Sequence, residues 1–142
     1  MGYLEEIGRC GRDANPFFRL MDISIHSYGD GQAQLSMLIR PDMLNGQGWL
    51  QGGIFTALSD EAMALALYTL LVEGELIATI SENTSYLMGI REGRIMAQGW
   101  VIRKGRQVAF SEACIRKADI NGPGALANQG IFYDSSGMKL CR

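Results

Sequence analysis

The stretch IFTALSDEAMALALYTLLV, residues 54–72, decides the fold. From Ala62 onward it is apolar on nearly every side, which predicts a helix, beginning near Gly53, that is surrounded by protein rather than lying on a surface. Its most apolar part, residues 62–72, is shorter than the roughly 18 to 20 residues that span a bilayer. We therefore expect a buried central helix and no association with a membrane.

Strand-like stretches flank this helix on both sides. Before it, alternating apolar and polar residues from Met21 and again over about 32–40 predict two strands joined by a turn at Gly29-Asp30-Gly31. After it, strands are predicted at about 76–87, 94–103, 106–120 and 125–133. This order favours an α+β fold in which one curved antiparallel sheet of five to six strands wraps around one long helix. Such a sheet leaves edges exposed, which favours pairing with a second copy.

Length, composition and charge limit the possible classes of protein. The 142 residues suit one domain over 1–142, with a short N-terminal helix or extension over 1–14 and a polar tail over 134–142. Glycine accounts for 18 residues, well above the usual share of about 7%, which favours a strand-rich fold with many turns. The formal net charge of −2 gives no electrostatic footprint for nucleic acid.

Histidine and cysteine usage excludes several kinds of site. His26 is the single histidine, which excludes a metal site of several histidines, an HExxH helix and a two-histidine phosphoryl-transfer site. The three cysteines are odd in number and show no CxxC spacing, which fits neither a zinc ribbon nor a disulfide framework. The N-terminus carries acidic residues where a signal peptide would be basic and then apolar. We expect a cytoplasmic protein without a metal.

Asp60 is the first candidate for chemistry. It lies about two turns into the apolar helix, where an ionised carboxylate is costly unless it has a partner or a task. At helical spacing it shares a stripe of small and polar residues with Gly53, Thr56 and Ala64, which leaves room for a ligand beside the carboxylate. An alternative of similar weight is that Asp60 and Glu61 are solvated on the exposed early part of the helix.

The start of the helix supplies the second candidate. Free backbone N–H groups at Gly52 and Gly53, together with the helix dipole, suit a carbonyl oxygen that gains negative charge. Asn45 in the preceding loop either orients water or a substrate carbonyl, or shapes an Asn-Gly turn. Seven residues separate Gly53 from Asp60, about 10 Å of helix, too far for both to act on one small reacting centre. Two helices that meet across a homodimer would bring Asp60 of one chain near Gly52 of the other.

The pattern N-G-x-x-x-x-Q-G-G-x-x-x-x-x-x-D, from Asn45 to Asp60, resembles that of the hotdog-fold acyl-CoA thioesterases, especially the phenylacetate-catabolism branch. The resemblance extends over roughly residues 15–133. It implies a hotdog fold with active sites at the dimer interface, and no cofactor beyond the coenzyme A of the substrate. It also implies that Asp60 is the general base or nucleophile, that the Gly52 N–H is the oxyanion donor, and that Asn45 positions substrate or water.

Several positions depart from the family pattern. Gln51 stands where relatives usually have histidine, and glutamine can hydrogen-bond but cannot titrate. Met88 and Gly89 stand where relatives often have a polar residue and proline, and Ala64 offers no hydroxyl. Ser85 is near enough in sequence to supply one.

Further residues are expected to bind substrate. The basic pair Arg103 and Lys104 at a strand turn suits the phosphates of coenzyme A, although a solvated turn explains the pair as well. The full expected substrate-binding set is Gln51, Gly53, Thr56, Ser85, Arg103 and Lys104.

These observations predict a hydrolase that cleaves acyl-CoA thioesters and forms a homodimer or a pair of dimers. An acyl-CoA-binding or sensing domain without catalytic activity is the main alternative, favoured by Gln51, Met88 and Ala64. A dehydratase of the same fold is disfavoured, because His26 has no acidic partner in a shared motif.

Overall fold

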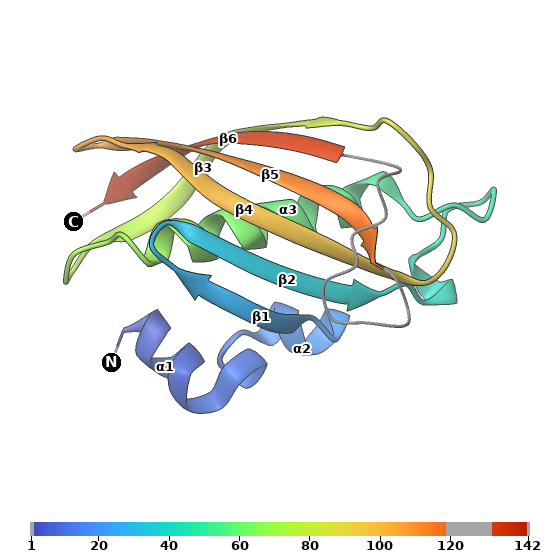
Figure 1. Cartoon of the computed structure of the whole chain (residues 1–142), viewed down its shortest axis with the longest axis horizontal. Coiled ribbons are helices and arrows are strands. Elements are labelled where there is room, and N and C mark those ends of the chain that lie inside the picture. Colours follow the sequence, from blue (N-terminus) through green and yellow to red (C-terminus); the bar gives the residue numbers. More distant parts are fainter. Residues whose placement is uncertain (1, 119–131, 142) are drawn as a thin grey trace.

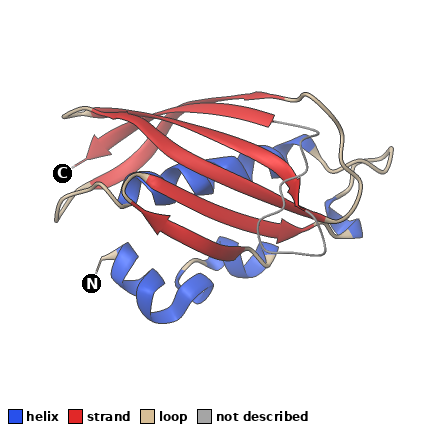
Figure 2. Cartoon of the chain, viewed as in Figure 1, coloured by secondary structure: helices blue, strands red, loops and turns tan. Residues whose placement is uncertain are grey.

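A computed structural model describes residues 2–118 and 132–141. The helices are α1 (Tyr3–Cys10), α2 (Pro16–Met21) and α3 (Gly52–Tyr68), with 3-10 turns at Gly11–Ala14 and Pro41–Met43. The strands are β1 (Ser24–Gly29), β2 (Gln32–Leu38), β3 (Leu76–Ser85), β4 (Arg94–Lys104), β5 (Val108–Ala118) and β6 (Phe132–Cys141). They form one sheet of order β1-β2-β4-β5-β6-β3, with antiparallel pairs throughout. Figures 1 and 2 show α3 lying along one face of the curved sheet. The predicted fold class is confirmed.

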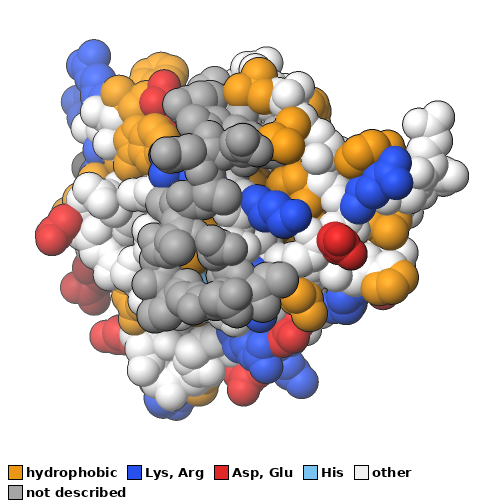
Figure 3. All heavy atoms as spheres, turned by 45° about the vertical axis from the view of Figure 1, so that its right-hand side comes forward, with side chains coloured by type: hydrophobic (Ala, Val, Ile, Leu, Met, Phe, Trp, Pro, Cys, Tyr) orange, Lys and Arg blue, Asp and Glu red, His pale blue; other side chains and the backbone are white. Residues whose placement is uncertain are grey.

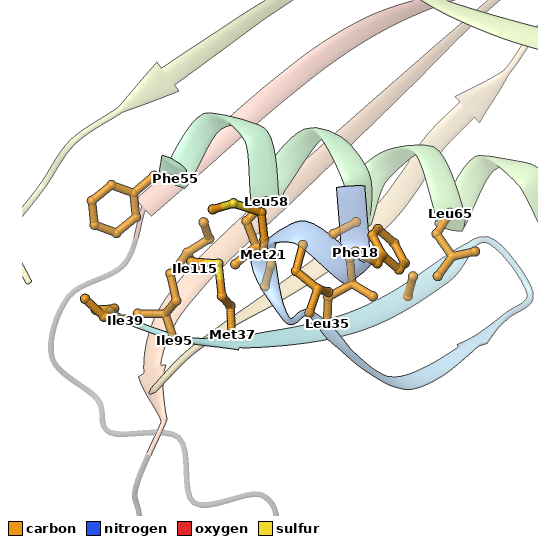
Figure 4. Packing of buried hydrophobic residues seen from close by; sticks show 14 of the residues in the cluster. Phe18, Met21, Leu35, Met37, Ile39, Phe55, Leu58, Leu65, Ile95 and Ile115 are labelled. Atoms are coloured by element: carbon orange, nitrogen blue, oxygen red, sulfur yellow. The ribbon is translucent and has the colours of Figure 1, made fainter. Parts of the chain in front are cut away.

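The main hydrophobic core lies between α3 and the sheet. Figure 4 shows Leu58 and Leu65 of α3 on the side of the helix that faces the sheet and Phe55 at its N-terminal end, while α2 closes the core from the side. The sheet and α2 contribute Phe18, Met21, Leu35, Met37, Ile95 and Ile115, all buried. The helix is buried over most of its circumference, as its uniform apolarity predicted.

One glycine sets how closely the helix approaches the sheet. A Cβ atom added to Gly99 of β4 would lie 2.6 Å from the backbone carbon and oxygen of Ala62. Only glycine therefore fits where β4 crosses the middle of α3. This contact fixes the depth of α3, and with it the position of the residues on either side of Ala62.

The N-terminal region holds a helix that the sequence analysis missed. Asn15 caps α2, since its Oδ1 accepts from the N–H groups of Phe17 and Phe18, and Pro16 occupies the first helical position. The first strand consequently begins at Ser24, three residues later than the alternation from Met21 predicted. The short N-terminal helix predicted within residues 1–14 is present as α1.

The C-terminal strand corrects a second expectation. The strand predicted at 125–133 lies largely outside the described residues. The chain instead forms β6 over Phe132–Cys141, which pairs with both β3 and β5. The prediction of a polar tail over 134–142 was wrong for residues 134–141, because two neighbouring strands satisfy the backbone of this polar segment.

Strand β3 forms one edge of the sheet. Most of its residues are exposed, and so are Tyr86, Leu87 and Met88, which follow it. Leu76 and Ile80 add two further large apolar side chains within the strand. An unpaired strand edge with exposed apolar groups is a template for pairing with another chain. Within the described residues, no helix has the length and apolarity needed to cross a membrane.

Candidate active site

Backbone N–H groups at the N-terminus of α3 lie between the loop that precedes this helix and the segment that follows β3. Gln51 is the N-cap, and its Oε1 accepts from the N–H of Gly53 at 2.6 Å. The Ile54 N–H bonds to the Gln51 carbonyl at 3.0 Å. These bonds leave the N–H of Gly52, the first helical residue, as the donor best placed to receive an oxyanion at the positive end of the helix dipole.

A cluster of hydroxyl groups holds this first turn against the end of β3. Tyr86 Oη donates to the Gly52 carbonyl at 3.0 Å, and Thr56 Oγ1 lies 2.9 Å from both Tyr86 Oη and Thr84 Oγ1. The Tyr86 ring covers Gly52 so closely that a Cβ atom there would lie 3.3 Å from ring atoms. Thr56, predicted to bind substrate, thus also positions the helix terminus.

The loop before α3 is shaped by Asn45. Its Oδ1 accepts from the N–H groups of Gln47 and Trp49, at 3.0 and 3.1 Å, and its own N–H bonds to the Trp49 carbonyl. The guanidinium of Arg91 lies 3.8 Å from the centre of the Trp49 ring. Asn45 therefore has a structural task in the turn, and the nitrogen of its side-chain amide is the part suited to contact a ligand.

Figure 3 looks toward the end of the molecule at the right of Figure 1, where this loop projects. Lys and Arg side chains lie next to hydrophobic ones on that face. An acidic side chain lies among them, so this face combines apolar groups with charges of both signs.

Asp60 lies two turns further along α3 and is partly exposed. Thr79 of β3 donates to Asp60 Oδ1 at 3.0 Å. This bond orients the carboxylate without neutralising it and leaves its second oxygen for water or substrate. Because Gly52 and Asp60 lie on the same helix, one chain does not bring them together, as the spacing predicted.

A pocket of about 380 Å³ opens beside Glu61 and Thr79, the residues next to Asp60 in sequence and in hydrogen bonding. It is lined by Tyr3, Ala14, Asn15, Pro16, Glu61, Ala64, Tyr68, Ile77, Ala78 and Thr79. Thr79 belongs both to this lining and to the bond with Asp60, so the pocket and the candidate catalytic carboxylate share a wall. The small side chain of Ala64 keeps the pocket open.

Glu61 is the carboxyl group within the pocket. Burial, and then the neighbouring charge of Asp60, raise the pKa of Glu61 from 4.5 to about 7, although a hydrogen bond from Asn15 acts in the opposite direction. Burial likewise raises the pKa of Tyr3 to about 12 and raises the pKa of Tyr68. The alternative that Glu61 is simply solvated does not fit this environment.

The remaining predicted residues lie elsewhere. Lys104 forms a salt bridge of 3.2 Å with the buried carboxylate of Glu75, at the C-terminal end of β4, while the opposite end of β4 lies near the start of α3. Arg103 precedes it and is exposed. Ser85 is exposed at the end of β3, where alternation turns it away from the face that Thr84 and Tyr86 share. The roles predicted for these three residues in binding substrate remain predictions.

Three features of the site were missed from the sequence. Thr79 and Tyr86 reach α3 only because β3 folds back beside it, and no sequence spacing reveals that contact. Asn15 could have been found, because an asparagine followed by proline is a signature of a helix start.

Over residues 2–118 and 132–141, no group of three or more potential metal ligands was found.

Comparisons with known proteins agree with this fold. A Haemophilus influenzae protein named "Putative esterase" is 26% identical over 68% of this chain and 70% of its own length. A thioesterase family protein from Silicibacter pomeroyi has the same fold, with a TM-score of 0.82, 19% identity and 98% of each chain covered. A phenylacetic acid degradation-related protein from Ralstonia eutropha has a TM-score of 0.80 and 18% identity, covering 97% of this chain and 99% of its own.

The sequence match to a family is independent of these likenesses in fold. The family model described as the thioesterase superfamily matches residues 47–123, more than half of the chain. The matched region contains the end of the loop before α3, the Gly-Gly start of the helix and Asp60, whereas Asn45 lies just outside it. The chain therefore belongs to the thioesterase superfamily.

Proposed function

We propose that this protein hydrolyses an acyl-coenzyme A thioester to a free acid and a thiol. The proposal rests on two groups in the first turns of α3. The helix begins with the Gly52 N–H, and two turns later the hydrogen bond from Thr79 fixes the orientation of the Asp60 carboxylate. Membership of the thioesterase superfamily supports the class of reaction.

The proposed chemistry uses these two groups and a water molecule. The thioester carbonyl oxygen accepts from the Gly52 N–H and gains negative charge as the tetrahedral intermediate forms. Asp60 takes a proton from water as the water oxygen attacks the carbonyl carbon. The carbon–sulfur bond then breaks, and the departing thiolate takes that proton from Asp60. In the second route that fits the same residues, Asp60 attacks the carbonyl carbon, the carbon–sulfur bond breaks and the thiolate leaves. Water then hydrolyses the resulting anhydride, which frees the acid and Asp60 and supplies the proton that the thiolate takes up.

The proposal requires a dimer. Gly52 and Asp60 are separated by about 12 Å along one helix, at 1.5 Å per residue, so the two groups that meet one carbonyl must come from different chains. The exposed apolar edge at β3 supports pairing with a second copy next to Thr79 and hence next to Asp60. We propose a homodimer, or a pair of dimers, acting in the cytoplasm.

Release of free thiol from a panel of acyl-CoA thioesters tests the function. Asp60→Asn should lower kcat by about 10²–10⁴-fold, because asparagine neither accepts a proton from water nor attacks a carbonyl. Asp30→Asn is the matched control. Asp30 lies in the exposed turn between β1 and β2 with φ 50°, a conformation that asparagine tolerates, so this variant should keep full activity.

One specific observation supports the alternative of binding without turnover. Gln51 already occupies the Gly53 N–H, which removes one of the two donors expected at the helix start. If the wild-type protein binds acyl-CoA thioesters and releases no thiol, the proposed hydrolysis is wrong and the binding function takes its place.

A further inference from the structure

The pocket beside Glu61 and Thr79 has a polar corner in an otherwise largely apolar lining. Glu61 reaches into it from α3, and the Asn15 amide bridges Glu61 and Tyr3. Asn15 Nδ2 lies 3.3 Å from Glu61 Oε2 and 2.8 Å from Tyr3 Oη, donating to both. Apolar side chains form much of the remaining wall: Ala14, Pro16, Ala64, Ile77 and Ala78.

The hydrogen-bonding capacity of this corner defines what it can recognise. Asn15 is fully engaged, because its Oδ1 caps α2 and its amide hydrogens go to Glu61 and Tyr3. After these bonds, the corner offers a ligand the second carboxyl oxygen of Glu61 as an acceptor and the Tyr3 hydroxyl hydrogen as a donor. A hydroxyl group, which both donates and accepts, satisfies the two at once.

The position of the corner links it to the acyl part of a substrate. Thr79 lines the pocket and donates to Asp60, so this one side chain connects the pocket with the carboxylate that would act on the carbonyl, although Asp60 is not itself part of the lining. Resting on the function proposed above, we propose that Glu61 is a specificity-determining residue that selects an acyl group carrying a distal hydroxyl. Asn15, whose amide also donates to Tyr3, holds Glu61 in place for this contact.

The same corner discriminates against other acyl groups. A plain alkyl chain covers the second carboxyl oxygen of Glu61 without giving it a hydrogen-bond donor, and leaving a buried polar atom unpaired weakens binding. A chain that ends in a carboxylate meets like charge once Glu61 is ionised. The titratable groups that face Glu61 are Asp60 and Tyr68 on α3 and Tyr3 on α1; with the pKa of Glu61 near 7, discrimination against carboxylates should be stronger at pH 8 than at pH 6.

Non-hydrolysable thioethers of coenzyme A test this selectivity apart from turnover. Chains of four to eight carbons would be compared in three forms, ending in methyl, hydroxyl or carboxylate, with affinities measured by calorimetry on the full-length protein. In the wild type, the hydroxylated chain of the best-fitting length should bind about tenfold more tightly than its methyl counterpart at pH 8. The carboxylate should bind more weakly than both.

Two substitutions at the same position separate charge from hydrogen bonding. Glu61→Gln should reduce the hydroxyl preference several-fold and relieve the discrimination against carboxylate, because the amide is neutral but still accepts a hydrogen bond. Glu61→Met should abolish the hydroxyl preference. Glu112→Gln, on the face of β5 opposite to the buried Ala113, is the matched control and should leave every affinity ratio unchanged.

The outcomes distinguish this inference from the proposed reaction. Affinity ratios that are the same in wild type and both Glu61 variants, or a wild type without the hydroxyl preference, overturn the role of Glu61 even if thioesters are hydrolysed. Selective binding that depends on Glu61 supports it even if a parallel thiol-release assay detects no hydrolysis. Thermal unfolding of each variant verifies that it is folded.

Discussion

At the scale of single residues, two adjacent carboxyl groups have different environments. Asp60 is partly exposed and accepts from Thr79, whereas Glu61 is mostly buried beside Asn15 and Tyr3. The sequence pattern singled out Asp60, but it offered no means of telling the environments of the two carboxyl groups apart. Their difference arises from α1 and α2, which cover Glu61 from a distant part of the chain.

Glu61 should make stability depend on pH. Its pKa is raised from 4.5 to about 7 in the folded protein, so ionisation disfavours folding, and stability falls as pH rises through this range. Glu61→Gln removes this penalty. The variant should gain about 1–2 kcal/mol over the wild type at pH 8, allowing for partial solvent exposure, and much less at pH 5. Urea unfolding at both pH values and equal protein concentration measures this. A gain that is equal at both pH values would contradict a raised pKa at Glu61.

At the scale of elements, local patterns identified α3 and most of the sheet. The apolar run predicted the helix, and alternation with glycine-rich turns predicted β2 to β5 within a few residues. Helix α2 was missed because six residues carry too little periodicity. Strand β6 was misplaced because its centre, DSSG at 134–137, is polar and contains glycine, and its pairing with β3 and β5 is a contact between distant parts of the chain.

The contact between α3 and β4 should be intolerant of any side chain at Gly99. Gly99→Ala would place its Cβ 2.6 Å from the Ala62 backbone, which forces the helix away from the sheet. We expect a loss of about 3 kcal/mol or more in the free energy of unfolding. Gly8→Ala is the control, because the nearest atom to its Cβ, Tyr28 Oη, is 3.7 Å away and alanine favours a helix. Equal stability of the two variants by urea unfolding would show that the close approach is unimportant.

At the scale of the whole molecule, each chain carries the two groups of the proposed site, Gly52 and Asp60, two turns apart on α3. Each group therefore belongs to a different site. The sequence predicted this division from the spacing between the glycines and Asp60. The sequence could not identify the strand edge with which a second chain would pair to complete the site. The edge that we propose for this role is β3, because it lies at the edge of the sheet and exposes Leu76 and Ile80.

A charge on this edge should disrupt both assembly and activity. Ile80→Lys places an ammonium among exposed apolar groups of β3 and should shift the protein to monomers, with loss of thiol release. Leu20→Lys makes the same change on exposed α2 and should alter neither property. Light scattering coupled to gel filtration gives the mass. A dimer of unchanged mass and activity in Ile80→Lys would exclude β3 as the interface.

The central claim is that the Gly52 N–H of one chain and Asp60 of the other act on the same thioester carbonyl. Complementation between two inactive variants tests this claim most directly. Gly52→Pro removes the candidate N–H, and proline suits the first position of a helix because Gln51 before it is already extended, with φ −63° and ψ 133°. The added ring also presses on Tyr86, since a Cβ atom there lies 3.3 Å from the Tyr86 ring, so thermal unfolding must show that this variant is folded. Gly52→Pro and Asp60→Asn should each be nearly inactive as homodimers.

Mixed dimers of the two variants should regain activity. Random mixing in equal amounts makes about half of the dimers hybrid, and each hybrid contains one intact site, so thiol release should recover to about a quarter of the wild-type value. Hybrids isolated with two different affinity tags should reach about half. Complete inactivity of folded hybrid dimers would contradict a catalytic site in which Gly52 and Asp60 come from different chains.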